Sequence, residues 1–217
     1  MCHNGIVYAR TVRGRTLTFG VSGMLWQSSL VMYDVETGSL WSHLLGEAMS
    51  GPLKGAVLEQ LPSVMTDWAT WKAKHPQTTV INLSRTSREY RRSFYRDPAQ
   101  FVLGIADGEA ALAWRFDLLQ RAVVWNDTWD GTPVVVFFDA GNSTARLFDR
   151  RLGGRTLVFE WQDARIRDRQ TRSVWDGVTG RATDGLLAEK HLKPLTAIVS
   201  YTRAWKVFHP TTTIRRP

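Results

Sequence analysis

The sequence predicts a mainly β protein made of two tandem repeats related by pseudo-symmetry, each a set of β-hairpins that ends in a short helix. The first observation is a stretch near the start, residues 13–19, that returns late in the chain as residues 153–159. The second is a series of short segments in which apolar and polar residues alternate, separated by glycine-containing turns. The third is a pair of short amphipathic segments that each end in His-Pro.

The repeat extends well beyond its first block. Phe19 aligns with Phe159, 140 positions later, whereas Trp41 aligns with Trp175, 134 positions later, so the second copy is six residues shorter between them. Further pairs keep one order: Asp34 with Asp168, Thr37 with Thr171, Ser39 with Ser173, Gly46 with Gly180, Trp71 with Trp205, and His75 with His209. Such a period exceeds that of solenoid repeats, so each copy is expected to be a small folded unit or half of one core.

The copies differ in extent. We divide the chain into a first repeat at residues 1–83, an arginine-rich and aromatic connector at 84–97, and a second repeat at 98–217. A block at residues 101–138 precedes the second copy of the shared motif, and the first copy has no counterpart of it. We therefore expect the first repeat to be incomplete at its N-terminal side.

Hairpins are expected throughout the first repeat. Its first turn is Arg13-Gly14, and its second is Glu36-Thr37-Gly38. The expected strands are residues 5–12, 16–21, 30–34 and 39–42, followed by short segments at 46–51 and 57–61 and a last strand at 78–83.

A short helix precedes that last strand. Thr66 is the expected N-cap, and Trp68 and Trp71 lie three residues apart on one face. His75 is followed by proline, and the residue before a proline is disfavoured in helical geometry, so His75 marks the helix end. This explanation leaves no metal site to assign to His75 or His209.

The second repeat follows the same plan with added elements. We expect hairpins at residues 101–114 with an Asp107-Gly108 turn and at 123–138, a short helix at 116–121, strands at 144–149 and 155–161, and a last helix at 200–207.

Composition and charge limit the classes of partner that the chain is expected to bind. The net charge is +8, but the arginines are spread out except for Arg85, Arg88, Arg91, Arg92 and Arg96 in the connector. Arginine beside aromatic residues can bind nucleic acid, yet the chain contains no nucleic-acid-binding motif, so we interpret the cluster as a solvated connector and do not expect a nucleic-acid partner. The sequence contains no apolar run long enough to span a membrane and indicates no cofactor.

Ten tryptophans are many for 217 residues. They are expected mainly in the core, with the alternative that some form a platform for an oligosaccharide or a peptide in a cleft between the copies. The binding candidates are Trp41 and Trp175, together with Asn126, Asp127 and Asp139 near hairpin ends. Aspartate is a common turn residue, so these carboxylates do not favour a glycosidase.

Two segments resemble a bacterial and archaeal family, domain of unknown function 3179, some members of which are described as selenoproteins. The segments are Cys2-His3-Asn4-Gly5-Ile6-Val7-Tyr8 and Gly14-Arg15-Thr16-Leu17-Thr18-Phe19-Gly20-Val21-Ser22-Gly23. Members carry Cys-Pro-x-Cys just ahead of this segment, sometimes with selenocysteine, and many are exported. The resemblance implies that Cys2 is the second cysteine of that motif. It also implies a thiol or selenol redox role, with His3 beside the sulfur.

Two hypotheses therefore stay open. In the first, Cys2 is the catalytic residue of a redox protein that acts on a redox-protein partner in the cell envelope. Here Cys2 is the only cysteine, and the resembling family's first cysteine and proline lie outside the sequence, so we expect an unpaired, inactive thiol. In the second, the chain is a non-catalytic module that binds a small molecule, glycan or peptide. The compartment is undetermined: the cell envelope if a signal precedes the sequence, otherwise the cytoplasm.

Overall fold

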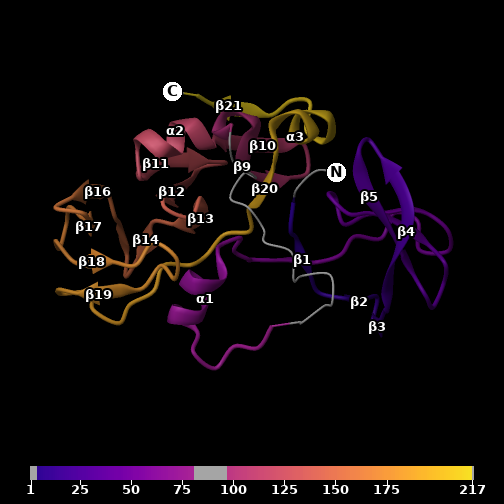
Figure 1. Cartoon of the computed structure of the whole chain (residues 1–217), viewed down its shortest axis with the longest axis horizontal. Helices are drawn as coiled ribbons and strands as arrows, with labels where there is room; N and C mark the ends of the chain where they lie inside the picture. Colours follow the sequence, from indigo (N-terminus) through magenta and orange to yellow (C-terminus); the bar gives the residue numbers. More distant parts are fainter. Residues whose placement is uncertain (1–3, 81–96, 217) are drawn as a thin grey trace.

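The structure, a computed structural model, describes residues 4–80 and 97–216. Within them the chain is mainly β, with short helices. Figure 1 shows one group of strands on the right from the first repeat, one on the left from the second, and a third at the top. The predicted fold class, two tandem pseudo-symmetric β repeats, is confirmed.

The two copies build the same sheet. In the first, the order is β4-β5-β6-β7, and in the second it is β16-β17-β18-β19, with every pair antiparallel. The strands are β4 (Phe19–Trp26), β5 (Ser29–Asp34), β6 (Leu40–Ser42), β7 (Ala48–Ser50), β16 (Phe159–Gln162), β17 (Arg165–Asp168), β18 (Val174–Trp175) and β19 (Ala182–Asp184). A small hairpin precedes each sheet: β2 (Thr11–Val12) with β3 (Arg15–Thr16), and β14 (Arg151–Leu152) with β15 (Arg155–Thr156).

A buried aspartate organises each of these sheets. Asp34 accepts hydrogen bonds from the indole nitrogen of Trp41 at 2.9 Å and from the backbone nitrogen of Thr37 at 2.6 Å. Asp168 accepts the same two from Trp175 and Thr171, at 3.0 and 2.6 Å. Because a buried carboxylate must be hydrogen-bonded to be tolerated, the aspartate and its donors recur together in both copies.

The second repeat adds two further sheets. The hairpin of β9 (Phe101–Asp107) and β10 (Ala110–Arg115) lies between β20 (Ile198–Tyr201) and β21 (Thr213–Arg215). The other sheet has the order β11-β12-β13, formed by β11 (Val124–Trp129), β12 (Thr132–Asp139) and β13 (Thr144–Asp149). The short α2 (Phe116–Arg121) joins β10 to the second sheet region, as predicted.

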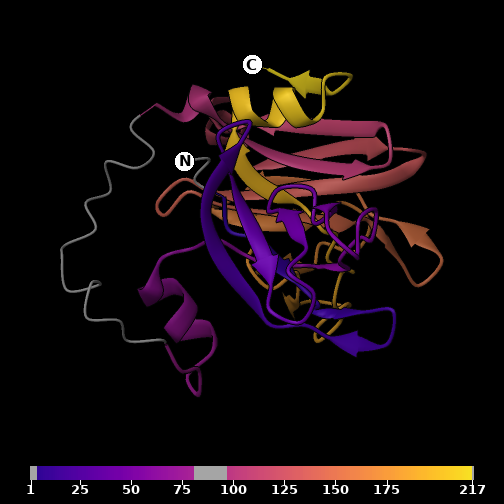
Figure 2. The ribbon, with the colours of Figure 1, turned by 90° about the vertical axis from the view of Figure 1, so that its right-hand side faces the viewer.

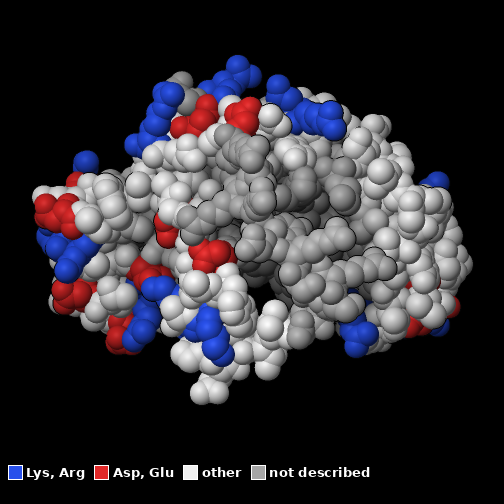
Figure 3. Space-filling model, viewed as in Figure 1, with Lys and Arg blue, Asp and Glu red and all other residues white. Residues whose placement is uncertain are grey.

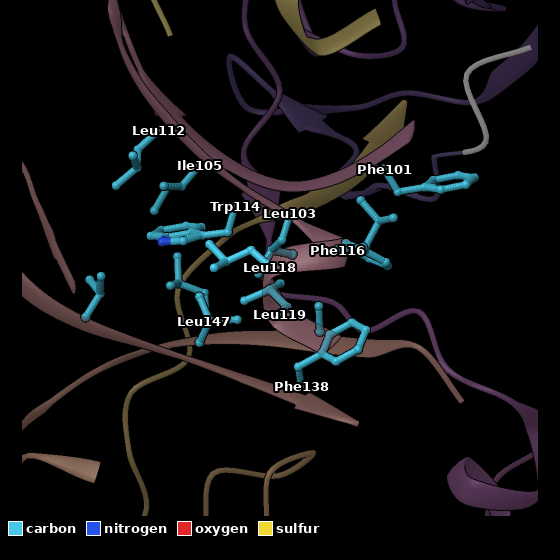
Figure 4. Close-up of a cluster of buried hydrophobic side chains, with 14 residues drawn as sticks. Phe101, Leu103, Ile105, Leu112, Trp114, Phe116, Leu118, Leu119, Phe138 and Leu147 are labelled. Atoms are coloured by element: carbon cyan, nitrogen blue, oxygen red, sulfur yellow. The ribbon is translucent and has the colours of Figure 1, made fainter. Parts of the chain in front are cut away.

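The largest core lies between these two sheets. Figure 4 shows Leu103, Ile105 and Trp114 from the β9–β10 hairpin pointing toward Phe138 and Leu147 of the other sheet. Alternation along β9 produces this arrangement, since every second residue of a strand points to the same face. The opposite face of the hairpin, with Val102 and Ala113, packs in a second cluster with Trp205 and Leu44.

The two repeat-ending helices are α1 (Trp68–Lys74) and α3 (Thr202–Phe208). The predicted helix end is confirmed, because His75 and His209 are the C-caps with identical φ −130° and ψ 72°. The predicted N-cap was one residue early, since the side chain of Asp67 accepts the hydrogen bond from Thr70 nitrogen. The second helix begins after Tyr201 because that residue pairs with β9.

The remaining differences concern strands. The expected strands at 16–21 and 155–161 are each divided in two, into β3 and β4 and into β15 and β16. The expected strand at 5–12 is two short ones, β1 (Val7–Tyr8) and β2, and β1 pairs with β8 (Gln60–Leu61). Residues 78–80 of the expected last strand form no strand, and 81–83 lie outside the described residues. The corresponding β21 pairs with β10, and the described part of the first repeat has no equivalent of β10. The division of the chain at 84–97 stays a prediction.

Each repeat-ending helix contacts the other repeat. Near α1, the Thr66 hydroxyl accepts a hydrogen bond from Thr144, and Thr70 accepts one from Asn142. On α3, Phe208 packs edge-on against Trp26 with ring centroids 5.1 Å apart, and both Figure 1 and Figure 2 show α3 beside the upper end of β4 and β5. The repeats are therefore joined through their helices.

In the part of the chain that the structure describes, no helix has the length and apolar character needed to span a membrane.

Candidate functional site

A cleft of about 500 Å³ lies where α1 of the first repeat meets the second repeat. Its walls come from segments far apart in the sequence: α1, the end of β12 with the following turn, the β16–β17 hairpin, and the turn after β18. The residues that line the cleft include Thr70, Lys74, Phe138, Asp139, Trp161, Arg165, Ile166, Trp175, Asp176 and Val178. This combination of one exposed aromatic ring, apolar floor residues and a few charged groups is typical of small-ligand sites.

Trp161 supplies the aromatic surface. It lies two residues after the buried Phe159 on β16, so the two side chains point to the same face of the sheet. Phe159 is covered by the core, whereas Trp161, near the end of the strand, is 51% exposed. Its cross-strand partner Ile166 is buried beneath the cleft. About half of Trp161 is therefore accessible to a ligand in the cleft.

Charged groups line the cleft near α1. Lys74 forms an ion pair with Asp176, which links α1 to the turn after β18. The same carboxylate accepts hydrogen bonds from Thr179, from its backbone nitrogen at 2.8 Å and its hydroxyl at 2.9 Å. Burial acts to raise the pKa of Asp176, but the hydrogen bonds from Lys74 and Thr179 outweigh it, so the pKa lies below its ordinary value.

The pseudo-equivalent place in the first repeat is filled. By the 134-residue offset, Phe208 of α3 replaces Lys74, and Leu44 replaces Val178. Leu44 is buried against Trp205, and Phe208 packs on Trp26. Two helix–repeat contacts of common origin have therefore diverged: the one at α3 is apolar and packed, and the one at α1 is hollow and charged.

A family model described as "Protein of unknown function (DUF3179)" matches residues 1–101 and, a second time, residues 96–212. The chain belongs to the DUF3179 family. Two successive matches to one model agree with the two sheets of the same strand order. No curated protein and no solved structure matches the chain.

The residues that the DUF3179 resemblance singled out, Cys2 and His3, lie outside the described residues. Their redox role stays a prediction. Among the described residues of this DUF3179 chain there is no group of three or more His, Cys, Asp or Glu side chains placed to hold a metal ion.

Two of the other predicted site residues meet in the cleft. Asp139, at the end of β12, is exposed and accepts a hydrogen bond from Gly141 nitrogen at 2.8 Å. Trp175 lies at the base, 3% exposed, with its indole nitrogen bonded to Asp168. Asp139 therefore offers an exposed carboxylate to the cleft, while Trp175 lines it with a side chain that is almost fully buried.

The remaining three predicted binding residues lie elsewhere in the DUF3179 fold. Trp41 is completely buried in the first repeat. Asn126 bridges two strands, because its side chain donates to Phe159 oxygen at 2.7 Å and accepts from Phe159 nitrogen at 3.0 Å. Asp127 accepts hydrogen bonds from the indole of Trp114 and the guanidinium of Arg215. These contacts join strands, and a binding role for the three stays a prediction.

Sequence reasoning did not single out Trp161, Lys74, Arg165 or Asp176. Strand alternation from Phe159 places Trp161 on the inward face and so predicts a buried side chain, and its 51% exposure emerges only from the structure. The charged residues carried no local signal, because Lys74 and Asp176 are 102 residues apart.

Figure 3 shows how charge is distributed around this region. Lysine, arginine, aspartate and glutamate are interspersed over the left-hand part of the molecule, which carries the second repeat. Fewer charged side chains are seen on the right, where the first repeat lies. The face around the cleft is thus of mixed sign, which suits a polar ligand of low net charge better than a polyanion.

Proposed function

We propose that this DUF3179 chain is a non-catalytic binding module that holds a carbohydrate in the cleft between α1 and the second repeat. The observation that carries the proposal is the half-exposed ring of Trp161 in a cleft bordered by Asp139, Lys74 and Asp176. Sugar rings have an apolar C–H face and a rim of hydroxyl groups. An indole face with carboxylate and ammonium groups around it complements both.

The division of roles follows from the chemistry of each group. Trp161 covers the apolar face of one sugar ring, which gains the dispersion and burial energy of a large aromatic contact. The carboxylates of Asp139 and Asp176 accept hydrogen bonds from sugar hydroxyls, and Arg165 and Lys74 donate to them. None of these groups needs to gain or lose a proton for binding.

The proposal also accounts for the divergence of the two helix–repeat contacts. A contact that serves only to join the repeats gains stability by filling its space with apolar side chains, as Leu44 and Phe208 do. Hollow space lined by charged groups contributes less to stability. Its presence at α1 is explained if that space has an occupant.

A glycan panel tests the proposal. Immobilised oligosaccharides of varied composition would be exposed to the full chain, and hits would be measured in solution by isothermal titration calorimetry. We expect one class of glycan to bind one-to-one, and Trp161→Ala to weaken it by at least about tenfold, since aromatic anchors dominate binding sites.

The matched control is Trp68→Ala. Trp68 is exposed to a similar degree, 48% against 51%, but lies outside the cleft, so this variant should bind the glycan as the parent chain does. Equal loss of binding in both variants, or no glycan bound at all, would reject the carbohydrate proposal.

The alternative redox function depends on Cys2, which the structure does not describe. Family membership supports it only through the resemblance of the N-terminal motif. Reaction of Cys2 with a thiol reagent across a pH series provides its test. A thiolate reactive well below the ordinary thiol pKa of about 8.5 would support redox work, and ordinary thiol behaviour would remove that support.

A further inference from the structure

The β16–β17 hairpin has a polar outer face that begins at the cleft. Glu160 and Arg167 are cross-strand partners, and so are Gln162 and Arg165. Cross-strand partners lie on the same face of a sheet, and so do residues two apart along one strand. These four side chains therefore share one face, opposite to the face that Trp161 belongs to.

Arginine is in excess on this outer face. Arg169 and Arg172 reach it as well, because both form ion pairs with Glu160. The face thus carries the side chains of Arg165, Arg167, Arg169 and Arg172 around one glutamate. Even with Asp163 at the hairpin tip included, positive charges outnumber negative ones by two.

The same positions of the first repeat are uncharged. The counterparts of Glu160, Arg165, Arg167, Arg169 and Arg172 are Gly20, Val31, Tyr33, Val35 and Gly38. Both copies nevertheless build a sheet of the same strand order. The arginines are therefore not required for the sheet to fold, and their excess calls for another explanation.

Arg172 is present at the expense of backbone strain. Its φ is +59°, in the left-handed region where residues other than glycine are disfavoured. The equivalent Gly38 has φ +70°, so a glycine would adopt this turn without strain. Strained residues of this kind are concentrated at functional sites. The second repeat thus places an arginine side chain on this face at a position better suited to glycine.

The arginine face already accommodates one carboxylate. Arg169 Nε donates a hydrogen bond to Glu160 at 3.0 Å, and Arg172 Nη1 donates to the other oxygen of the same carboxylate. Arg172 also donates to the side-chain oxygen of Gln162, whose cross-strand partner is Arg165. The guanidinium group of Arg172 therefore extends across the sheet toward Arg165.

Arg165 joins this face to the cleft. It is exposed, and it lines the cleft together with Trp161. Within residues 4–80 and 97–216, the Arg165 side chain forms no hydrogen bond or ion pair. Its donors are free to bind a ligand, so a molecule that rests on Trp161 can place an anionic group against Arg165 and Arg172.

We propose, on the basis of the carbohydrate function proposed above, that the bound oligosaccharide contains a uronic acid whose carboxylate is held by Arg165 and Arg172. A guanidinium group presents paired N–H donors that match the two oxygens of a carboxylate. A single acidic unit also suits the mixed charge of the cleft, since a polyanion would be repelled by Asp139 and Asp176.

Matched pairs of sugars provide the test. The acidic members are tetrasaccharides that end in one galacturonic, glucuronic or mannuronic acid, and in their partners the carboxylate is reduced to a primary alcohol. Isothermal titration calorimetry with the full chain gives an affinity ratio for each pair. We expect at least one acidic member to bind about tenfold tighter than its partner, as charge-assisted hydrogen bonds predict. Added salt should lower this ratio.

A variant of Arg172 locates the carboxylate. Arg172→Gly should bring the affinity ratio close to one. Glycine adopts φ +59° without strain, and Glu160 keeps Arg169 as its partner, so the variant should fold as the parent chain does, which thermal unfolding checks.

The matched control is Arg203→Gln. It removes one positive charge from an exposed position on α3, which lies on the other side of the molecule from β16 and β17 in Figure 1. This variant should keep the affinity ratio of the parent chain.

The outcomes separate this inference from the carbohydrate function on which it rests. Equal affinities within every pair would overturn the uronic acid assignment and leave the carbohydrate function standing. A ratio that Arg172→Gly leaves unchanged, or that Arg203→Gln lowers equally, would also overturn it, because the carboxylate would then be bound elsewhere or attracted only by net charge. Absence of binding by every tetrasaccharide would reject both.

Discussion

The indole nitrogen of Trp175 donates a 3.0 Å hydrogen bond to the completely buried carboxylate of Asp168. Thr171 binds the same carboxylate through its backbone nitrogen and its hydroxyl. The aspartate therefore satisfies a buried donor of the core and fixes the turn between β17 and β18 at once.

Asp168→Ala should destabilise the fold by about 3 kcal/mol, because it leaves the buried indole N–H without an acceptor and removes the turn contacts. The free energy of unfolding in urea measures this. Asp34→Ala should cost a similar amount, since Asp34 has the same partners. Asp107→Ala, at an exposed hairpin end, is the control and should change stability by less than about 0.5 kcal/mol.

Gly46→Ala should be strongly destabilising for two separable reasons. Gly46 has φ +67°, where an L-residue is strained, and an added Cβ would lie 2.6 Å from the ring of Tyr8. Gly131→Ala provides the comparison, since φ is +71° there and no atom lies within 4 Å. We expect about 1 to 2 kcal/mol for Gly131→Ala and about 3 kcal/mol for Gly46→Ala. Equal losses would show that the Tyr8 contact is unimportant.

The ion pair of Asp127 with Arg215 makes the stability of the fold depend on pH. Burial acts to raise the pKa of Asp127, but hydrogen bonds from Arg215, Thr128 and Trp114 outweigh it, so the folded-state pKa lies below the ordinary 3.8. A lowered folded-state pKa contributes stability that is complete above 3.8 and is lost as the pH falls through the folded-state value. The free energy of unfolding should therefore decrease in this acid range.

Asp127→Asn tests that assignment. At pH 7 it should cost about 2 kcal/mol, because the hydrogen bonds to the charged carboxylate are weakened, and the difference from the parent chain should shrink below pH 3.8. Asp130→Asn, on the exposed turn of the same hairpin, should leave the profile unchanged. A difference that stays constant with pH would contradict the linkage to Asp127.

Lys74→Ala should raise the pKa of Asp176, because the ion pair helps to lower it. Carbon-detected titration of the Asp176 carboxyl by NMR measures the shift directly. The lysine side chain is 38% exposed, so solvent screens the pair and the loss of stability should be below about 1 kcal/mol. An unchanged titration would mean that Lys74 and Asp176 are not paired in solution.

The sequence predicted the repeated sheets well because the residues that the copies share are the ones that fix the local fold. Asp34, Thr37 and Trp41 recur with the same spacing as Asp168, Thr171 and Trp175, and they form one hydrogen-bonded unit in each copy. Shared residues of this kind report local structure. Their burial also explains why they carry little information about a ligand.

The cleft was harder to predict, for a physical reason. It exists because α1 contacts the second repeat, and contacts between segments about a hundred residues apart leave no pattern in a single sequence. The predicted Asp139 and Trp175 do line it, yet Lys74 and Asp176 were indistinguishable from ordinary surface charges. Strand alternation assigns Trp161 to the inward face but does not predict its exposure in the cleft.

Neither repeat is structurally independent of the other. Thr66 and Thr70 form hydrogen bonds with Thr144 and Asn142, and Phe208 packs on Trp26. Units that arise by duplication can usually fold separately from each other. Here, residues 1–83 and 98–217 produced as two separate polypeptides should associate as a heterodimer, because the helix that ends each repeat packs against the other repeat.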